Sequence, residues 1–262
     1  ERPQIMEGNE DWTLPNVEDE DAIPIYKELA EDHSYVPIWK ATDQAETNLR
    51  VASLYMNGAL HGKQDSMLKI QTWMVLREID ILFVVDARVT VTRGKWLRKQ
   101  LGQIWPGATL KTYPTKEIMG TRSIGSFGAM GGSIAIVSPA WSPRLTSMGW
   151  KESDQTELGL IGRLSLRVNE SETITIIGNY IPPRPAKDGG ESTLWARVSR
   201  YLSRNKLAAM SPKTYLQNIT ASFVAQARKR GHTFILVVDF NETVNNKKIR
   251  YSLATWTTAQ GM

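Results

Sequence analysis

This chain has no cysteine, only three histidines and no long apolar run. Without cysteine it cannot form disulfides, a thiolate zinc site or a cysteine nucleophile. Three histidines leave little room for a histidine metal cluster. No apolar run approaches the roughly 20 residues of a membrane span, and no signal-peptide pattern is visible. We therefore expect an intracellular protein with no membrane association, in either the nucleus or an organelle matrix.

The length of 262 residues is enough to bury a full hydrophobic core. Hydrophobic residues make up 41% and charged residues 23% of the chain, which is typical of a folded protein. This length suits one large α/β domain or two small ones, and we expect one. Because the first residue is Glu1, we expect the chain to be processed, excised or incomplete at its start.

The net charge of +5 hides an asymmetry along the chain. Residues 1–35 carry eleven acidic side chains against two basic ones, a balance of −9, and the remainder carries thirty basic against sixteen acidic, a balance of +14. A basic body with an acidic arm is typical of nucleic-acid binders, although a solvated acidic tail explains it equally well. We expect residues 1–47, which include four prolines, to lie on the surface or on a partner, and residues 48–262 to form the domain.

The most informative stretch is 233–243, whose sequence is TFILVVDFNET. Its five consecutive apolar residues, 234–238, predict a strand buried on both faces. Asp239 and Asn241 follow them, and side chains two residues apart point to the same side. Their oxygens could hold a Mg²⁺-bound water or a phosphate oxygen. The alternative is that they only start a turn.

Further elements are expected before this stretch. Alternating or short apolar runs predict strands at 49–55, 81–85, 133–138, 160–168 and 173–180, the last two antiparallel. Amphipathic spacing predicts helices from about residue 65, at 191–204 and at 212–230, and a further helix is expected at 252–260. This mixture of strands and helices indicates an α/β fold.

Two other stretches could contact phosphate. Basic residues surround Trp96, and such a helix face can lie against phosphates, although Trp96 itself is expected to be partly in the core; they are Arg88, Arg93, Lys95, Arg98 and Lys99. The Gly-rich tract 125–132 leads into a strand and not into a helix, which excludes a P-loop.

Five segments, taken in order, resemble the endonuclease/exonuclease/phosphatase superfamily, and most closely the endonuclease domain of LINE-type non-LTR retrotransposons. They are LRVASLYMNG at 49–58, DILFVVDAR at 80–88, GGSIAIVS at 131–138, IGNYIPP at 177–183 and ILVVDFN at 235–241. The similarity covers about 49–262. It implies two mixed β-sheets packed face to face with helices outside, a four-layer sandwich. It also implies an active site at one edge of the sandwich and Mg²⁺-dependent phosphodiester hydrolysis.

The resemblance also implies roles for single residues. Asp239 and Asn241 match the family's Asp-x-Asn, which holds the attacking water and the scissile phosphate. Tyr180 matches the tyrosine that contacts the phosphate, and Asn57 matches the second polar position of the first motif. Asp86 stands where the family has its metal-binding Glu, so its carboxylate reaches one methylene less far toward a Mg²⁺ that requires tight octahedral geometry.

Two departures from the family pattern concern the chemistry. The family's leading Asn is here Tyr55, which replaces an amide with a ring. The family also has a terminal Ser-Asp-His motif with the general acid/base histidine, whereas this chain ends about twenty residues after Asn241. None of the histidines stands at that place; they are His33, His61 and His232. We therefore expect a domain that lacks its last strands at the C-terminus.

These departures favour a degenerate, non-catalytic protein that binds nucleic acid or serves as a structural subunit of a larger assembly, such as a ribonucleoprotein. The alternative is an active Mg²⁺-dependent endonuclease whose missing motif is absent from this sequence or supplied by another chain. Mg²⁺ is expected only in that active form. We expect a protein partner that covers the open sheet edge, and nucleic acid is a second candidate partner through the basic body.

Overall fold

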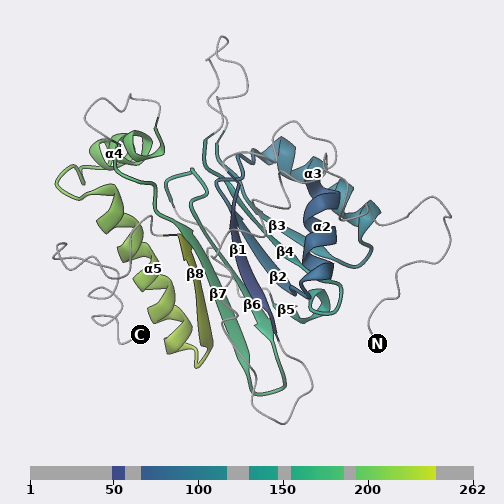
Figure 1. Cartoon of the computed structure of the whole chain (residues 1–262). Coiled ribbons are helices and arrows are strands. Elements are labelled where there is room, and N and C mark those ends of the chain that lie inside the picture. Colours follow the sequence, from purple (N-terminus) through teal and green to yellow (C-terminus); the bar gives the residue numbers. More distant parts are fainter. Residues whose placement is uncertain (1–48, 57–65, 117–129, 147–154, 186–192, 240–262) are drawn as a thin grey trace.

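The computed structural model describes residues 49–56, 66–116, 130–146, 155–185 and 193–239, and the strands in these segments form two mixed four-stranded sheets (Figure 1). The first sheet has the order β1-β2-β4-β3 and the second β5-β6-β7-β8. The strands of the first sheet are β1 (Val51–Tyr55), β2 (Ile81–Val85), β3 (Thr109–Tyr113) and β4 (Ser133–Val137). Those of the second are β5 (Leu145–Thr146), β6 (Ile161–Arg167), β7 (Thr173–Tyr180) and β8 (Thr233–Asp239).

Helices cover the outer faces of both sheets (Figure 1). Helices α2 (Ser66–Leu76) and α3 (Val91–Ile104) pack on the first sheet, and α4 (Leu194–Arg204) and α5 (Pro212–Lys229) pack on the second. A third apolar cluster lies between the sheets, where β1 contacts β8, β2 contacts β7 and β4 contacts β6. These four layers confirm the predicted α/β sandwich with helices outside. None of the helices in the described segments is long and apolar enough to cross a membrane.

Two glycines let the sheets approach each other closely. Gly162 of β6 and Gly178 of β7 are register partners. A Cβ on Gly162 would lie 2.3 Å from the ring of Tyr113, and a Cβ on Gly178 would lie 2.2 Å from the ring of Phe83. The two rings stack, with centroids 6.3 Å apart. The first sheet therefore inserts two aromatic side chains into a hollow that exists because β6 and β7 have glycine at this register.

Local sequence signals set the helix boundaries. The hydroxyls of Thr90, Thr193 and Ser211 cap the N-termini of α3, α4 and α5 by accepting a backbone N–H. Helix α5 ends at Lys229 with Arg230 as its C-cap, and the next residue, Gly231, has a φ of +71° that glycine adopts without strain. The N–H of His232 donates to the Ala227 carbonyl, so the chain turns directly from α5 into β8.

The structure corrects the prediction for residues 234–238. Ile235 and Val237 are buried between the sheets, but Phe234, Leu236 and Val238 are only partly buried, against the helix layer. The strand is therefore not fully buried on both faces. The reason is its position: β8 is an edge strand of its sheet among the described residues.

Two strands, β3 and β5, were not predicted from the sequence. The predicted strands at 49–55, 81–85, 133–138, 160–168 and 173–180 are confirmed to within two residues at each end, as are the helices from about 65 and at 212–230. The helix predicted at 191–204 is confirmed with its described start at Leu194. The extension 1–47 and the expected helix 252–260 lie outside the described residues.

Candidate functional site

The carboxyl ends of four strands meet at one edge of the sandwich. β1 runs parallel to β2 and β7 runs parallel to β8, and Tyr55 at the end of β1 stacks on Tyr180 at the end of β7. Asp86 directly follows β2, and Asp239 at the end of β8 is the register partner of Tyr180. The N–H of Ile181 donates to the Asp239 carbonyl at 2.9 Å. The fold thus places Asp86, Tyr180 and Asp239 at a single edge.

Tyr55 and Tyr180 form the aromatic part of this edge. Their ring centroids lie 5.3 Å apart with an angle of 22° between the planes. Tyr55 is 43% exposed and Tyr180 only 3%, so Tyr55 is the outer ring. Burial is the main cause that raises the pKa of both hydroxyls, and the nearby carboxylates of Asp86 and Asp239 raise it further. Both hydroxyls are therefore neutral near pH 7 and can donate hydrogen bonds.

Asp86 is enclosed by the chain. The whole residue is only 2% exposed, and its Oδ1 accepts a hydrogen bond from the N–H of Gly131 at 3.0 Å. Burial raises the pKa of the Asp86 carboxyl, and the Gly131 N–H, the charge of Arg88 and the neighbouring Tyr55 side chain only partly oppose this rise. The protonated, neutral form of the Asp86 carboxyl is therefore more favoured in this site than it is in water.

The end of the Gly-rich tract builds this enclosure. Gly131 has a φ of +87°, and a Cβ there would lie 2.4 Å from the Leu158 carbonyl oxygen. Gly132 has a φ of +75°, and a Cβ there would lie 2.6 Å from the Val89 carbonyl oxygen. Only glycine fits both the backbone conformation and the space. The tract, described here from residue 130 on, therefore serves to bring a backbone N–H onto Asp86.

Arg88 also belongs to the site at this edge, although the sequence analysis did not include it among the site residues. Its charge lowers the pKa of both Asp86 and Tyr55. It is half-buried, and its φ of +51°, like the +47° of Asp86, is unusual for a residue with a side chain. Such conformations gather at functional sites. In the sequence, its position two residues after Asp86 was the available signal.

Other residues of the predicted site are not placed at this edge. Asn57 and Asn241 lie outside the described residues, as do His33 and His61. His232 immediately precedes β8, so the seven residues of that strand, roughly 20 Å, separate it from the end that carries Asp239. Its Nδ1 lies 2.9 Å from the Thr175 hydroxyl, and burial, with the charge of Arg230, lowers its pKa. A neutral, hydrogen-bonded His232 supports the start of the strand.

The described residues at this edge do not fit a Mg²⁺ ion. Mg²⁺ requires near-octahedral oxygen ligands and retains several waters. Asp86 is shielded from water, and its Oδ1 is engaged by a backbone N–H. No group of three or more His, Asp or Glu side chains within the described segments could hold a metal ion.

No protein-family model and no curated protein sequence matches the chain. Among solved structures, an AP endonuclease from Leishmania major is similar with a TM-score of 0.50 and 15% identity, covering 86% of this chain and 66% of that one. An AP endonuclease from Archaeoglobus fulgidus is similar with a TM-score of 0.44 and 16% identity, covering 80% and 63%. The endonuclease domain of TRAS1, a telomere-specific non-LTR retrotransposon, is similar with a TM-score of 0.38 and 14% identity, covering 81% and 71%. This chain thus spans about two thirds of the Leishmania protein's length, and that first similarity identifies the fold.

Proposed function

We propose that this chain, which has the fold of the endonuclease/exonuclease/phosphatase superfamily, is a degenerate, non-catalytic relative of those nucleases. In this proposal residues 48–262 form the nuclease-like domain, residues 1–47 are an acidic extension, and the protein works inside the cell as a nucleic-acid-binding or structural subunit of a larger assembly. The observation that supports it best is the enclosure of Asp86 by the Gly131 N–H and the Tyr55 side chain.

The enclosure opposes catalysis for a physical reason. Hydrolysis of a phosphodiester at this edge would need room for the phosphate and a charge or metal to stabilise it. Instead, Tyr55 stacks over Tyr180, and Asp86 is buried with its Oδ1 on the Gly131 N–H. In our proposal Asp239, Asn241, Tyr180 and Asn57 occupy the former catalytic positions, and Asp86 occupies the former metal position.

The proposal predicts that the chain does not cut nucleic acid. Supercoiled plasmid and a labelled RNA are incubated with the full chain in Mg²⁺ or Mn²⁺. Their cleavage is expected to be no greater than with an Asp239→Ala variant. Without a positioned general base a hydrolysis rate falls by about 10²- to 10⁴-fold, and within the described residues no histidine lies at this edge. Metal-dependent cleavage by the parent chain that is lost in both Asp239→Ala and Asp86→Ala would disprove the non-catalytic function.

The second candidate is an active Mg²⁺-dependent endonuclease that hydrolyses DNA or RNA phosphodiester bonds. It is supported by the convergence of Asp86, Tyr180 and Asp239 at one edge. In this case the missing motif would be absent from this sequence or supplied by another chain. The cleavage assay, repeated in an extract and scored against the same two variants, distinguishes the two functions.

We also propose that a protein partner covers an open sheet edge. Among the described residues, β8 is hydrogen-bonded to a single strand, β7, and β1, which contacts β8, is likewise at the edge of its sheet. The β8 sequence TFILVVD has no Lys, Arg or Pro, the residues that usually protect an edge. An added strand would pair with the side of β8 that faces away from β7, which nucleic acid cannot do as regularly.

This partner proposal predicts that the isolated chain self-associates or aggregates. The reason is that an unpaired apolar strand edge pairs readily with another chain. Light scattering at physiological salt, with a thermal melt on the same sample, is the measurement. A monodisperse monomer with a cooperative melt would show that the chain covers its own edge.

A further inference from the structure

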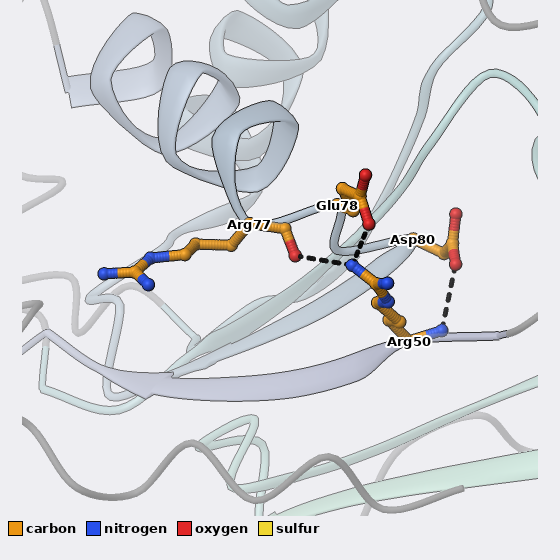
Figure 2. A network of polar contacts seen from close by, with 4 residues as sticks. All are labelled: Arg50, Arg77, Glu78 and Asp80. Atoms are coloured by element: carbon orange, nitrogen blue, oxygen red, sulfur yellow. Dashed lines mark hydrogen bonds and ion pairs between the residues drawn. The ribbon is translucent and has the colours of Figure 1, made fainter. Parts of the chain in front are cut away.

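The helix layer on the first sheet has an excess of positive charge. Residues 66–116 contain nine Lys and Arg against three Asp and Glu. Of these three carboxylates, Asp86 is buried at the strand-end site, and Arg50 of the preceding strand segment contacts the other two (Figure 2). Its guanidinium pairs with Glu78, and its backbone N–H donates to Asp80 Oδ2 at 2.9 Å. The remaining cations of the layer are therefore not balanced by carboxylates of the same segment.

Helix α3 presents three of these cations on one face. No Asp or Glu occurs anywhere between Ala87 and Lys116. Lys95, Arg98 and Lys99 are exposed, at the i, i+3 and i+4 spacing that places side chains on one side of a helix. We call these three residues the α3 basic face. It lies on the outer side of the sheet that contains β1 to β4, across the molecule from α4 and α5 (Figure 1).

The opposite side of α3 fixes the direction of this face. Gly94, Leu97 and Leu101 are buried toward the sheet. A Cβ on Gly94 would lie 3.0 Å from the side chain of Thr112, so the helix rests closely on β3. Since the helix cannot rotate without separating these contacts, the α3 basic face stays turned to solvent.

Two arginines of the helix are held in place. The Nε of Arg98 donates to the Leu110 carbonyl and its Nη2 donates to the Thr112 hydroxyl, each at 3.4 Å. The guanidinium of Arg93 lies 3.8 Å from the centre of the Trp96 ring. A guanidinium that is already positioned loses less entropy when it binds a ligand. The helix is thus better prepared for an anion than a row of free lysines.

We propose that the α3 basic face binds the phosphodiester backbone of a nucleic acid. Lys95 and Lys99 are one helical turn apart, about 6 Å along the axis, with Arg98 between them, so several phosphates can be contacted at once. Val91, one turn before Lys95, is exposed, but no large apolar or aromatic side chain is exposed between Lys95 and Lys99, whereas a protein interface usually centres on a buried apolar or aromatic anchor. This favours a polyanion over a protein partner.

The inference rests on the nucleic-acid-binding part of the proposed function and locates it. The surface lies on the outer face of a helix and not at the strand ends that carry Asp86 and Asp239, so binding requires neither cleavage nor a metal. Contacts to phosphate carry no base sequence information. The expected ligand is therefore RNA or DNA without strong sequence preference.

The test measures binding and salt dependence in EDTA. Fluorescence anisotropy of the full chain with a labelled single strand of about 20 nucleotides, as RNA and as DNA, is followed across a salt series. The triple variant Lys95→Gln, Arg98→Gln, Lys99→Gln is expected to reduce the slope of log K against log salt by about 2 and to bind about a hundredfold more weakly near 0.1 M salt. Parent and variants are melted to verify folding.

The matched control removes the same charge elsewhere. Arg200→Gln, Arg204→Gln and Lys206→Gln neutralise three exposed cations on and after α4, and this variant is expected to stay within about threefold of the parent. Because Arg98 also bonds to β3, the double variant Lys95→Gln, Lys99→Gln serves if the triple variant does not fold. This double variant should reduce the slope of log K against log salt by about 1.4.

Each outcome decides the proposal. A folded triple variant with unchanged slope, an equal loss in the α4 control, or a parent that binds neither RNA nor DNA would overturn it. Tighter binding of polyglutamate than of nucleic acid at equal charge would also overturn it, in favour of an acidic protein partner. Failure of the non-catalytic function is seen separately, because cleavage is measured in Mg²⁺ and binding is measured in EDTA.

Discussion

The Arg163→Ala variant is expected to unfold with a free energy about 3–5 kcal/mol lower than the parent chain. Arg163, in the middle of β6, is only 1% exposed and is among the largest fully buried side chains of the described segments. Its Nη1 donates to Gln226 at 3.1 Å, and its guanidinium lies 3.9 Å from the centre of the Phe223 ring. Both partners belong to α5, so alanine leaves a cavity between sheet and helix and removes the donor to Gln226.

Two further substitutions separate volume from charge. Arg163→Met fills most of the space but removes the guanidinium from the Phe223 ring, and because Gln226 is exposed and can bond to water instead, the cost is expected to be about 1 kcal/mol. Arg167→Ala, at the exposed end of the same strand, should change stability by less than about 0.5 kcal/mol. Urea unfolding of the three variants measures these differences. A cost for Arg163→Ala no larger than that for Arg167→Ala would contradict the packing of α5 on β6.

Arg163 also shows what the sequence could not reveal. The alternation along 160–168 predicts a strand with Arg163 on the polar side, and the strand is confirmed. A polar side chain within such a pattern normally faces water. Here α5 covers that side, so the arginine is buried. Which helix covers which face depends on contacts between residues 60 or more positions apart, and local periodicity does not encode them.

The convergence at the strand ends could be anticipated because it follows from topology. Asp86, Tyr180 and Asp239 each stand at or directly after the last residue of a predicted strand, and the ends of parallel strands meet at one edge. The enclosure of Asp86 could not be anticipated. It depends on Gly131, 45 residues away, and on the orientation of the Tyr55 ring. Strand β3 was missed because TLKTY is short and half polar.

The Gly178→Ala variant is expected to lose about 1–3 kcal/mol of stability through overpacking. The added Cβ would lie 2.2 Å from Cδ1 of Phe83, and that ring is fully buried and stacked on Tyr113. Tyr113 in turn donates its hydroxyl to the Arg163 carbonyl at 2.9 Å. The ring cannot move without disturbing these contacts, so the two sheets must separate slightly.

A double-mutant cycle tests this cause directly. In a Phe83→Leu background the smaller side chain leaves room, so Gly178→Ala should cost clearly less than in the parent. Gly102→Ala on α3 meets nothing within 4 Å and is expected to stabilise the chain by up to about 1 kcal/mol. Equal costs of Gly178→Ala in both backgrounds would refute the clash. Because Gly178 lies two residues before Tyr180, and Phe83 three before Asp86, the same glycine sets the distance between the two strands that carry the site.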